Sequence, residues 1–216
     1  MTDFAAARRN MVDGQVRTAD VTDLRILSAM LAIPREAFLP AGKAALAYLD
    51  LDAPVGEGNR RLIKPMLLAK LIHAADLAGT DRVLDVGCAT GYGAAVLARL
   101  AGQVVALEQD AGLARSARAA LGQLPNVTVE SAALTEGWPQ GGPYDVIVVE
   151  GATEFAPQAL LRQLKDDGRL VCVLGSGPSG KAMLYRRAGP ETGGRVIFDA
   201  AAPVLPGFVK PPEFAF

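Results

Sequence analysis

The sequence predicts an α/β protein with a doubly wound, mostly parallel sheet and an N-terminal helical region. From residue 82 onward, strand-like runs alternate with helical segments, which is typical of right-handed crossovers in a parallel sheet. The strand-like runs are continuous in Val, Ile and Leu, so we expect strands buried on both faces. Before residue 80 the apolar residues recur at three- and four-residue steps, which indicates helices.

Length and composition indicate one globular domain. The 216 residues are expected to form a helical region with a substrate loop (1–78) and a ligand-binding core with a C-terminal extension (79–216). The formal charge of −1 gives no overall reason to expect nucleic acid or an anionic membrane as partner. Cys88 and Cys172 are too few for a disulfide framework and lack metal-ligand spacing, so no metal is expected. We expect a soluble cytoplasmic protein, because no signal peptide or membrane-length apolar run is seen.

The N-terminal elements follow from caps and prolines. Asp20 is expected to cap a helix that contains Leu24 to Leu31, and Pro34 to end it. The stretch "PREAFLP" predicts a short helical turn between two prolines, and Pro65 suits the first turn of a helix to about Leu77. The expected strands are 82–87, 103–108, 126–132, 144–152 and 168–175, with helices at 92–101, 110–121 and 157–165 between them. Two further strand candidates, "AMLYRRA" and "RVIFDAA", precede a proline-rich tail.

A glycine loop, "VLDVGCATGYG", marks the expected ligand site. Gly87 follows a strand and Gly91 precedes a helix, so backbone N–H groups can approach a ligand closely. Glu108 closes the next strand, 21 residues after Gly87, where a carboxylate can accept hydrogen bonds from both ribose hydroxyls. The pattern indicates a nucleoside-containing ligand, although a tight turn with a surface glutamate remains an alternative. The dinucleotide fingerprint would place its third glycine at Tyr92, which disfavours a nicotinamide oxidoreductase.

The loop resembles that of S-adenosylmethionine-dependent methyltransferases, with Ala89 at the middle glycine position. More of the chain is similar to the protein-L-isoaspartate O-methyltransferases. That resemblance runs over about residues 8–175 and is carried by "MVDGQV", "ILSAM", "IPREAFLP", "AYLD", "PVGEG", "GYGAAVLARL", "GWP", "YDVIVV" and "LLRQLKDDGRLVCVLG". It implies a Rossmann-like sheet of the class I methyltransferase type. The implied reaction transfers a methyl group from S-adenosylmethionine to the free α-carboxylate of isoaspartyl residues in damaged proteins. S-adenosylhomocysteine is the other product, and repair continues through a succinimide.

The resemblance also implies the residues of the cofactor site. These are Asp85, Gly87, Cys88, Ala89, Gly91, Tyr92, Glu108, Gln109, Ala132 and Ala133. Such a reaction asks little acid–base chemistry of the protein, because a carboxylate is already ionised at neutral pH. Orientation of the reacting atoms can contribute about 7–11 kcal/mol. The scarcity of Cys and of His, of which His73 is the only one and is expected to be structural, therefore does not count against an enzyme.

Three positions depart from the family. In place of its Gln-Thr-Ile-Ser-Gln-Pro loop, this chain has "NRRLIKP" (59–65), so the hydroxyl-bearing residues are replaced by Arg61 and Ile63. The family's Gly-Asp-Gly appears as Ser131, Ala132 and Ala133, which removes the acid expected at the adenine amine. Glu150 stands where small residues usually follow the fourth strand.

Arg60, Arg61 and Glu150 are therefore the expected acceptor-site residues, with an arginine holding a carboxylate. Glu150 is expected to face the same crevice, where it would repel an anionic acceptor or be neutralised by the arginines. Alternatively, it would orient or deprotonate a hydroxyl or amine acceptor. A solvated arginine loop and a Glu150 cap or salt bridge remain alternatives. So do a relative that methylates another acceptor and a non-catalytic S-adenosylmethionine-binding protein. The sequence does not give the oligomeric state or the role of the tail.

Overall fold

The computed structural model describes residues 3–56 and 58–211 and has the expected α/β architecture. One sheet has seven strands in the order β5-β4-β3-β6-β7-β8-β9; β3 to β7 run parallel, β8 is antiparallel to β7, and β9 is antiparallel to β8. The strands are β1 (Ala53–Pro54), β2 (Arg61–Leu62), β3 (Arg82–Val86), β4 (Gln103–Leu107), β5 (Val127–Glu130), β6 (Tyr144–Thr153), β7 (Leu164–Leu174), β8 (Lys181–Ala188) and β9 (Glu191–Asp199). The mostly parallel, doubly wound sheet is thus confirmed.

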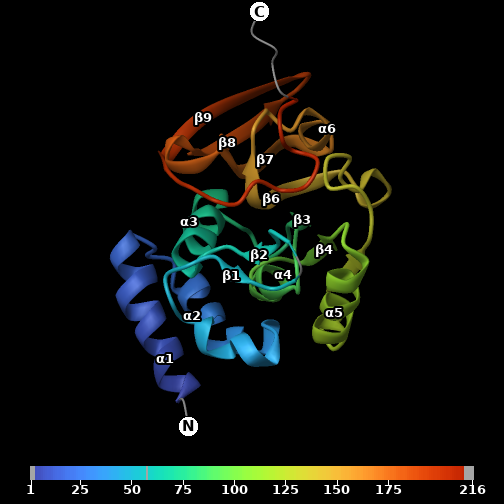
Figure 1. Ribbon diagram of the computed structural model, residues 1–216. Helices are drawn as coiled ribbons and strands as arrows, with labels where there is room; N and C mark the ends of the chain where they lie inside the picture. Colours follow the sequence, from blue (N-terminus) through green and yellow to red (C-terminus); the bar gives the residue numbers. More distant parts are fainter. Residues whose placement is uncertain (1–2, 57, 212–216) are drawn as a thin grey trace, which may run out of the picture.

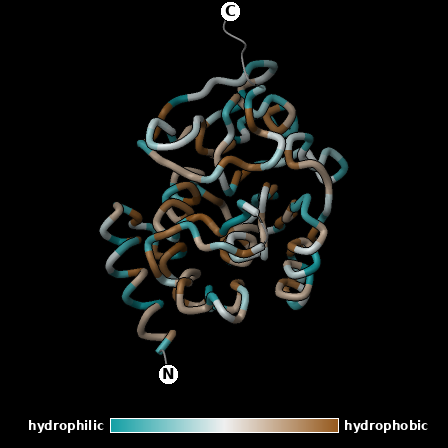
Figure 2. Tube along the Cα trace, in the orientation of Figure 1, coloured by the Kyte–Doolittle hydropathy of each residue, from teal (hydrophilic) through white to brown (hydrophobic). Residues whose placement is uncertain are grey.

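The helices lie on both sides of this sheet. They are α1 (Phe4–Met11), α2 (Leu24–Ala32), α3 (Pro65–Ala75), α4 (Tyr92–Leu97), α5 (Ala111–Leu121) and α6 (Gln158–Leu161), with short π- and 3-10-helical turns between α1 and β1. In Figure 1 the blue N-terminal helices lie on one side of α4 and the green α5 lies on the other. Figure 2 shows hydrophobic residues concentrated where α3 meets the sheet, because that helix is buried along most of its length.

Two expected boundaries in the first half of the chain are wrong. Asp20 does not cap α2: it takes a left-handed conformation (φ 64°) that closes the preceding 3-10 turn. Asp23 is the cap, since its extended backbone lets its carboxylate accept the N–H of Arg25 at 2.8 Å. Pro65 does begin α3, but this helix ends at Ala75 because Asp76 is left-handed (φ 50°).

Two further corrections concern the arginine loop and the start of β7. The loop carrying the arginines is a short antiparallel hairpin, in which Arg61 of β2 pairs with Pro54 of β1. Strand β7 begins at Leu164, which pairs with Tyr144, rather than at residue 168. The helix expected over 157–165 is therefore limited to α6, because its last residues belong to the sheet.

The ligand end of the sheet is set by its strand order. The chain moves from β3 outward to β4 and β5 and then returns to β6 on the other side of β3, where Val86 is in register with Val149. Ligands bind at such a switch point, outside the carboxyl ends of the strands. Residues 87–91, 108–110 and 150–153 all lie at this end.

Two buried apolar clusters flank the sheet, and the larger one joins the N-terminal helices to α3, α4 and the strands. This continuity supports the prediction of a single domain over residues 1–216, which stays a prediction. Within residues 3–56 and 58–211, no helix has the length and apolar character needed to cross a membrane.

The tail packs on the body of the protein. Ala152 donates its N–H to Pro203 O, and Leu205 donates its N–H back to Ala152 O, each at 2.9 Å. Further along, Glu154 donates its N–H to Phe208 O at 2.9 Å. The segment up to residue 211 therefore lies across the carboxyl end of β6, and residues 212–216 lie outside the described part of the chain.

Candidate functional site

The glycine loop between β3 and α4 is held by unusual backbone conformations. Gly87, Ala89 and Gly91 all have positive φ, of 80°, 52° and 97°. A Cβ on Gly87 would lie 3.0 Å from the side chain of Leu205, and one on Gly91 would lie 2.8 Å from Leu121. Glycine is therefore needed at both positions for close packing as well as for backbone conformation.

Glu108 occupies the expected place directly after β4 and is completely buried. One carboxylate oxygen, Oε2, accepts the N–H of Ala89 at 2.9 Å, and Oε1 accepts the N–H of Asp110 at 3.0 Å. These bonds fix the carboxylate between the glycine loop and the start of α5. The alternative of a surface glutamate is therefore wrong, whereas its role toward a ribose stays a prediction.

Arg60 is the unexpected partner of this carboxylate. It precedes β2 and its side chain is only 10% exposed. Its Nη2 forms an ion pair with Glu108 Oε2 and also donates to Gly87 O at 3.3 Å. The solvated-loop alternative is therefore wrong for Arg60. Arg61 differs, since it is half-buried and donates only a 3.4 Å bond to Asn59 among the described residues.

A pair of buried acids lies beside the Arg60–Glu108 ion pair. Asp85 in β3 and Glu150 in β6 are both buried, and their carboxyl groups lie within hydrogen-bonding reach of each other. Neither Asp85 oxygen has a donor among the described residues, nor does Glu150 Oε1. Burial, together with the charges of Glu150 and Glu108, raises the pKa of Asp85 well above its ordinary value. Burial raises the pKa of Glu150 to about 7.

Glu150 fits its place because residue 93 is glycine. A Cβ on Gly93 would lie 1.6 Å from Glu150 Oε1, so any larger residue there would exclude the carboxylate. Among the described residues Glu150 forms neither the cap nor the salt bridge considered for it: a hydrogen bond with Asp85 and the charges of Arg35, Arg60 and Glu108 act on it instead.

Arg35 is a buried residue of this site that sequence reasoning missed. It is 1% exposed and donates to the carbonyl groups of Ala47 and Ile63, each at 2.9 Å. Its guanidinium lies 4.6 Å from the ring centroid of Tyr92, and burial raises the pKa of that tyrosine to about 12. An arginine between two apolar segments in "IPREAFLP" was the available signal, because a buried charge needs partners.

The remaining predicted cofactor residues lie along the same edge. Gln109 accepts the N–H of Leu134 at 3.4 Å through its side chain, while Ala132 is half-buried and Ala133 exposed next to it. Cys88 is buried, which raises the pKa of its thiol and makes it a structural residue. The structure thus brings all ten predicted cofactor residues to one end of the sheet, and their roles stay predictions.

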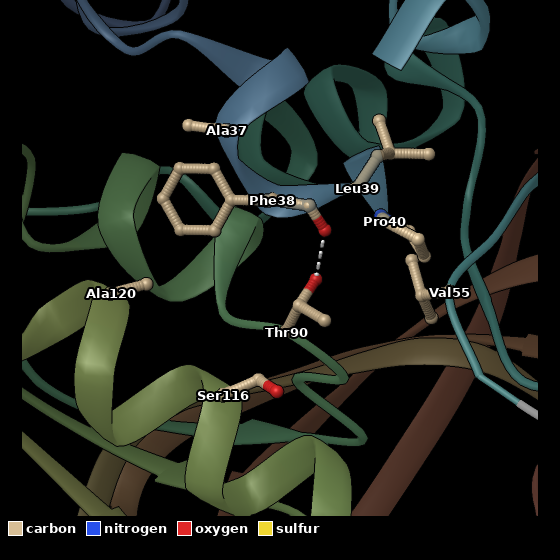
Figure 3. A pocket seen from close by; sticks show the side chains of 8 residues that line it. All are labelled: Ala37, Phe38, Leu39, Pro40, Val55, Thr90, Ser116 and Ala120. Carbon is tan, nitrogen blue, oxygen red and sulfur yellow. Dashed lines mark hydrogen bonds between the residues drawn. The ribbon is translucent and has the colours of Figure 1, made fainter. Parts of the chain in front are cut away.

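A hollow of about 320 Å³ lies on the far side of the glycine loop. Figure 3 shows it between Phe38, Thr90 and α5, with the Thr90 hydroxyl donating to Phe38 O at 2.6 Å. This bond ties the loop to the N-terminal region. The hollow is lined by Thr90 of the glycine loop but by none of the buried acids.

The residues fit an S-adenosylmethionine molecule. Asp85 and Glu150 offer unpartnered carboxyl oxygens to a cationic group, and Glu108 offers a fixed carboxylate to a ribose. A sheet of this strand order, with a glycine loop after β3 and a buried acid after β4, defines a class I methyltransferase.

Comparisons with known proteins give the family. Residues 7–203 match the family described as Protein-L-isoaspartate(D-aspartate) O-methyltransferase. A protein-L-isoaspartate O-methyltransferase 1 of Rhodopseudomonas palustris strain HaA2 is 43% identical over 85% of this chain and 75% of that protein. A protein-L-isoaspartate O-methyltransferase of Methylorubrum populi is 42% identical over 88% of this chain and 89% of that protein. The chain therefore belongs to the protein-L-isoaspartate O-methyltransferase family and is by that membership an S-adenosylmethionine-dependent methyltransferase.

Solved structures agree with this assignment. A structure named protein-L-isoaspartate O-methyltransferase has a TM-score of 0.79 and 27% identity, with 93% of this chain and 66% of that chain covered, so this chain spans just under two thirds of it. A Plasmodium falciparum structure is described as a β-aspartate methyltransferase in complex with S-adenosylhomocysteine. It has a TM-score of 0.78, with 92% of this chain and 97% of that chain covered. At 16% identity the latter shows the fold alone.

Proposed function

We propose that the buried site at the carboxyl ends of β3, β4 and β6 methylates the α-carboxylate of isoaspartyl residues in peptides and proteins. The observation that carries this proposal is Glu108, a fully buried carboxylate fixed by the N–H groups of Ala89 and Asp110 beside the glycine loop. A carboxylate so placed recognises an adenosine ribose. S-adenosylmethionine, when bound, supplies a methyl group on a positively charged sulfur.

The residues of this chain orient the reactants and exclude water. Asp85 and Glu150 hold the α-ammonium group of the donor's amino-acid part, and the packed tail around Leu205 closes the site from above Gly87. The acceptor carboxylate needs no base because it is ionised at neutral pH. With the donor bound, these residues would align the acceptor oxygen with the methyl carbon, and S-adenosylhomocysteine would be released as the other product.

Arg61 is the residue we assign to the acceptor. It lies in the same hairpin as Arg60, and its only partner among the described residues is Asn59, at 3.4 Å. The position that matches the family's serine is Ile63, which is 1% exposed and uses its carbonyl to hold Arg35. An anionic acceptor is therefore held by a guanidinium rather than a hydroxyl in this chain.

The test is methylation of an isoaspartyl peptide with labelled donor, against the same peptide with normal aspartate. We expect a base-labile label in the isoaspartyl peptide alone. Arg61→Ala should lower kcat/KM by roughly 10- to 100-fold, which corresponds to one charged hydrogen bond of about 1.5–3 kcal/mol. The matched control is Arg115→Ala, which removes an exposed arginine from α5. Tight binding of S-adenosylhomocysteine without any label transfer would reject the isoaspartyl acceptor.

Two further proposals follow from the sequence expectations. Isoaspartyl proteins are the proposed partners, with no nucleic acid and no membrane involved. The cytoplasm is the proposed compartment, supported by the two cysteines, which are both buried and unpaired.

A further inference from the structure

In the arrangement seen here, the Glu108 carboxylate can accept only one of the two hydroxyl groups of a ribose. A carboxylate has about four lone-pair positions. Three are taken: Oε2 accepts from Arg60 and Ala89, and Oε1 accepts from Asp110. The two hydroxyls of a ribose need two positions, so one of the present donors must leave.

Only Arg60 is free to leave. The N–H groups of Ala89 and Asp110 belong to the backbone and are fixed by the glycine loop and by the start of α5. Arg60, in contrast, is attached through a flexible side chain on a short hairpin. It is held through Nη2 alone, and its buried Nε has no partner among the described residues.

A released Arg60 would face the acceptor side of the site. Its charge already acts on Glu150, at the carboxyl end of β6. That end is the switch point, beside β3, where ligands bind. A guanidinium set free at this place can bind an incoming carboxylate through two parallel hydrogen bonds.

We propose that Arg60 occupies the ribose-binding carboxylate before the donor arrives, and that the donor displaces it toward the acceptor. This rests on the proposed function, since it needs an adenosine-bearing donor at Glu108. The chain thereby couples its two substrates: Arg60, a second anion-binding residue beside Arg61, becomes available to the acceptor only when the donor is in place.

The first experiment measures S-adenosylhomocysteine affinity by calorimetry in the wild type and in Arg60→Met. Methionine keeps an apolar stem in the hairpin but removes the competing guanidinium. S-adenosylhomocysteine is used because it has no sulfonium for Arg60 to repel. The variant should bind about tenfold more tightly than the wild type. An affinity equal to or weaker than that of the wild type would overturn the proposal.

The control is Arg169→Met, which breaks a similarly buried pair. Arg169 binds Asp81 at 2.8 Å at the amino end of the sheet, with side-chain exposures of 12% and 10%. This variant should lower the melting temperature and leave the affinity unchanged. A tenfold gain in Arg169→Met as well would show a general loosening and overturn the proposal.

The second experiment needs no variant for its main result. A crystal structure of the wild type with S-adenosylhomocysteine should show Arg60 parted from Glu108, and an intact pair would overturn the proposal. Isoaspartyl peptide should bind several-fold more tightly with S-adenosylhomocysteine present, and Arg60→Met should abolish that gain. A failure to methylate the peptide would reject the proposed acceptor. The displacement of Arg60 by the donor is tested separately, by the S-adenosylhomocysteine affinities and the crystal structure.

Discussion

The acid pair Asp85–Glu150 should make stability fall with rising pH, and Glu150→Gln should remove most of that fall. Burial raises the pKa of Glu150 from an ordinary 4.5 to about 7. Between these values the folded state binds more protons than the unfolded state, so the free energy of unfolding decreases as the pH rises. A tenfold difference in proton affinity between the two states corresponds to about 1.4 kcal/mol, so the free energy of unfolding should fall by about 3 kcal/mol in total.

The groups around Glu150 explain the size and sign of its pKa shift. Burial and the charge of Glu108 oppose ionisation of Glu150, whereas the hydrogen bond with Asp85 and the charges of Arg35 and Arg60 favour it without offsetting the cost of burial. Glutamine keeps the shape and can donate its amide N–H to Asp85, which leaves that carboxylate with a partner. The variant should therefore match the wild type near pH 5 and exceed its stability above pH 7.

Urea unfolding at intervals from pH 5 to pH 8.5 measures the effect. Glu191→Gln serves as the control, since Glu191 is exposed on β9 and should leave the wild-type curve unchanged. Parallel pH profiles for the wild type and Glu150→Gln would show that Glu150 does not titrate in this window, and would refute the reasoning.

The remaining predictions concern packing and can be measured by urea unfolding at pH 7. Gly93→Ala should cost about 1–3 kcal/mol because its methyl group meets the Glu150 carboxylate, and the double variant with Glu150→Ala should recover most of this; no recovery would contradict the cause. Leu205→Ala should cost about 2–5 kcal/mol, since this side chain fills the space above Gly87; a smaller cost would mean that the tail is loosely packed. Arg35→Met should cost a few kcal/mol, because a buried hydrogen bond to each of two carbonyl groups is lost at about 1–3 kcal/mol apiece; an unchanged midpoint would show that water replaces it.

The sequence was informative wherever the signal is local and periodic. The parallel strands are predictable because fully buried strands are continuous apolar runs. The end of the sheet that carries the site is predictable because Gly87 and Glu108 directly follow such runs. The start of α2 was misplaced because Asp20 and Asp23 are both good caps. Only the backbone conformation of each residue decides between them.

Contacts between distant segments could not be predicted. Arg60 and Glu108 are 48 residues apart, and nothing local to either residue indicates that they meet. The same holds for Arg35, which donates to Ala47 O and to Ile63 O after the hairpin, and for Leu205, which reaches Gly87 from the tail. Such pairs depend on how separate elements pack, so they become visible only in the folded structure.

Burial explains why a ribose-binding acid should carry an internal partner at all. A fully buried carboxylate that loses its ion-pair partner costs about 3–5 kcal/mol, which is a large fraction of the stability of a small domain. Arg60 removes this cost while no ligand is bound, and backbone donors alone leave part of it. The donor then has to compete with Arg60, so the chain gains stability without ligand at the expense of affinity. A variant with an apolar residue at position 60 should therefore have a lower free energy of unfolding and bind the nucleoside more tightly.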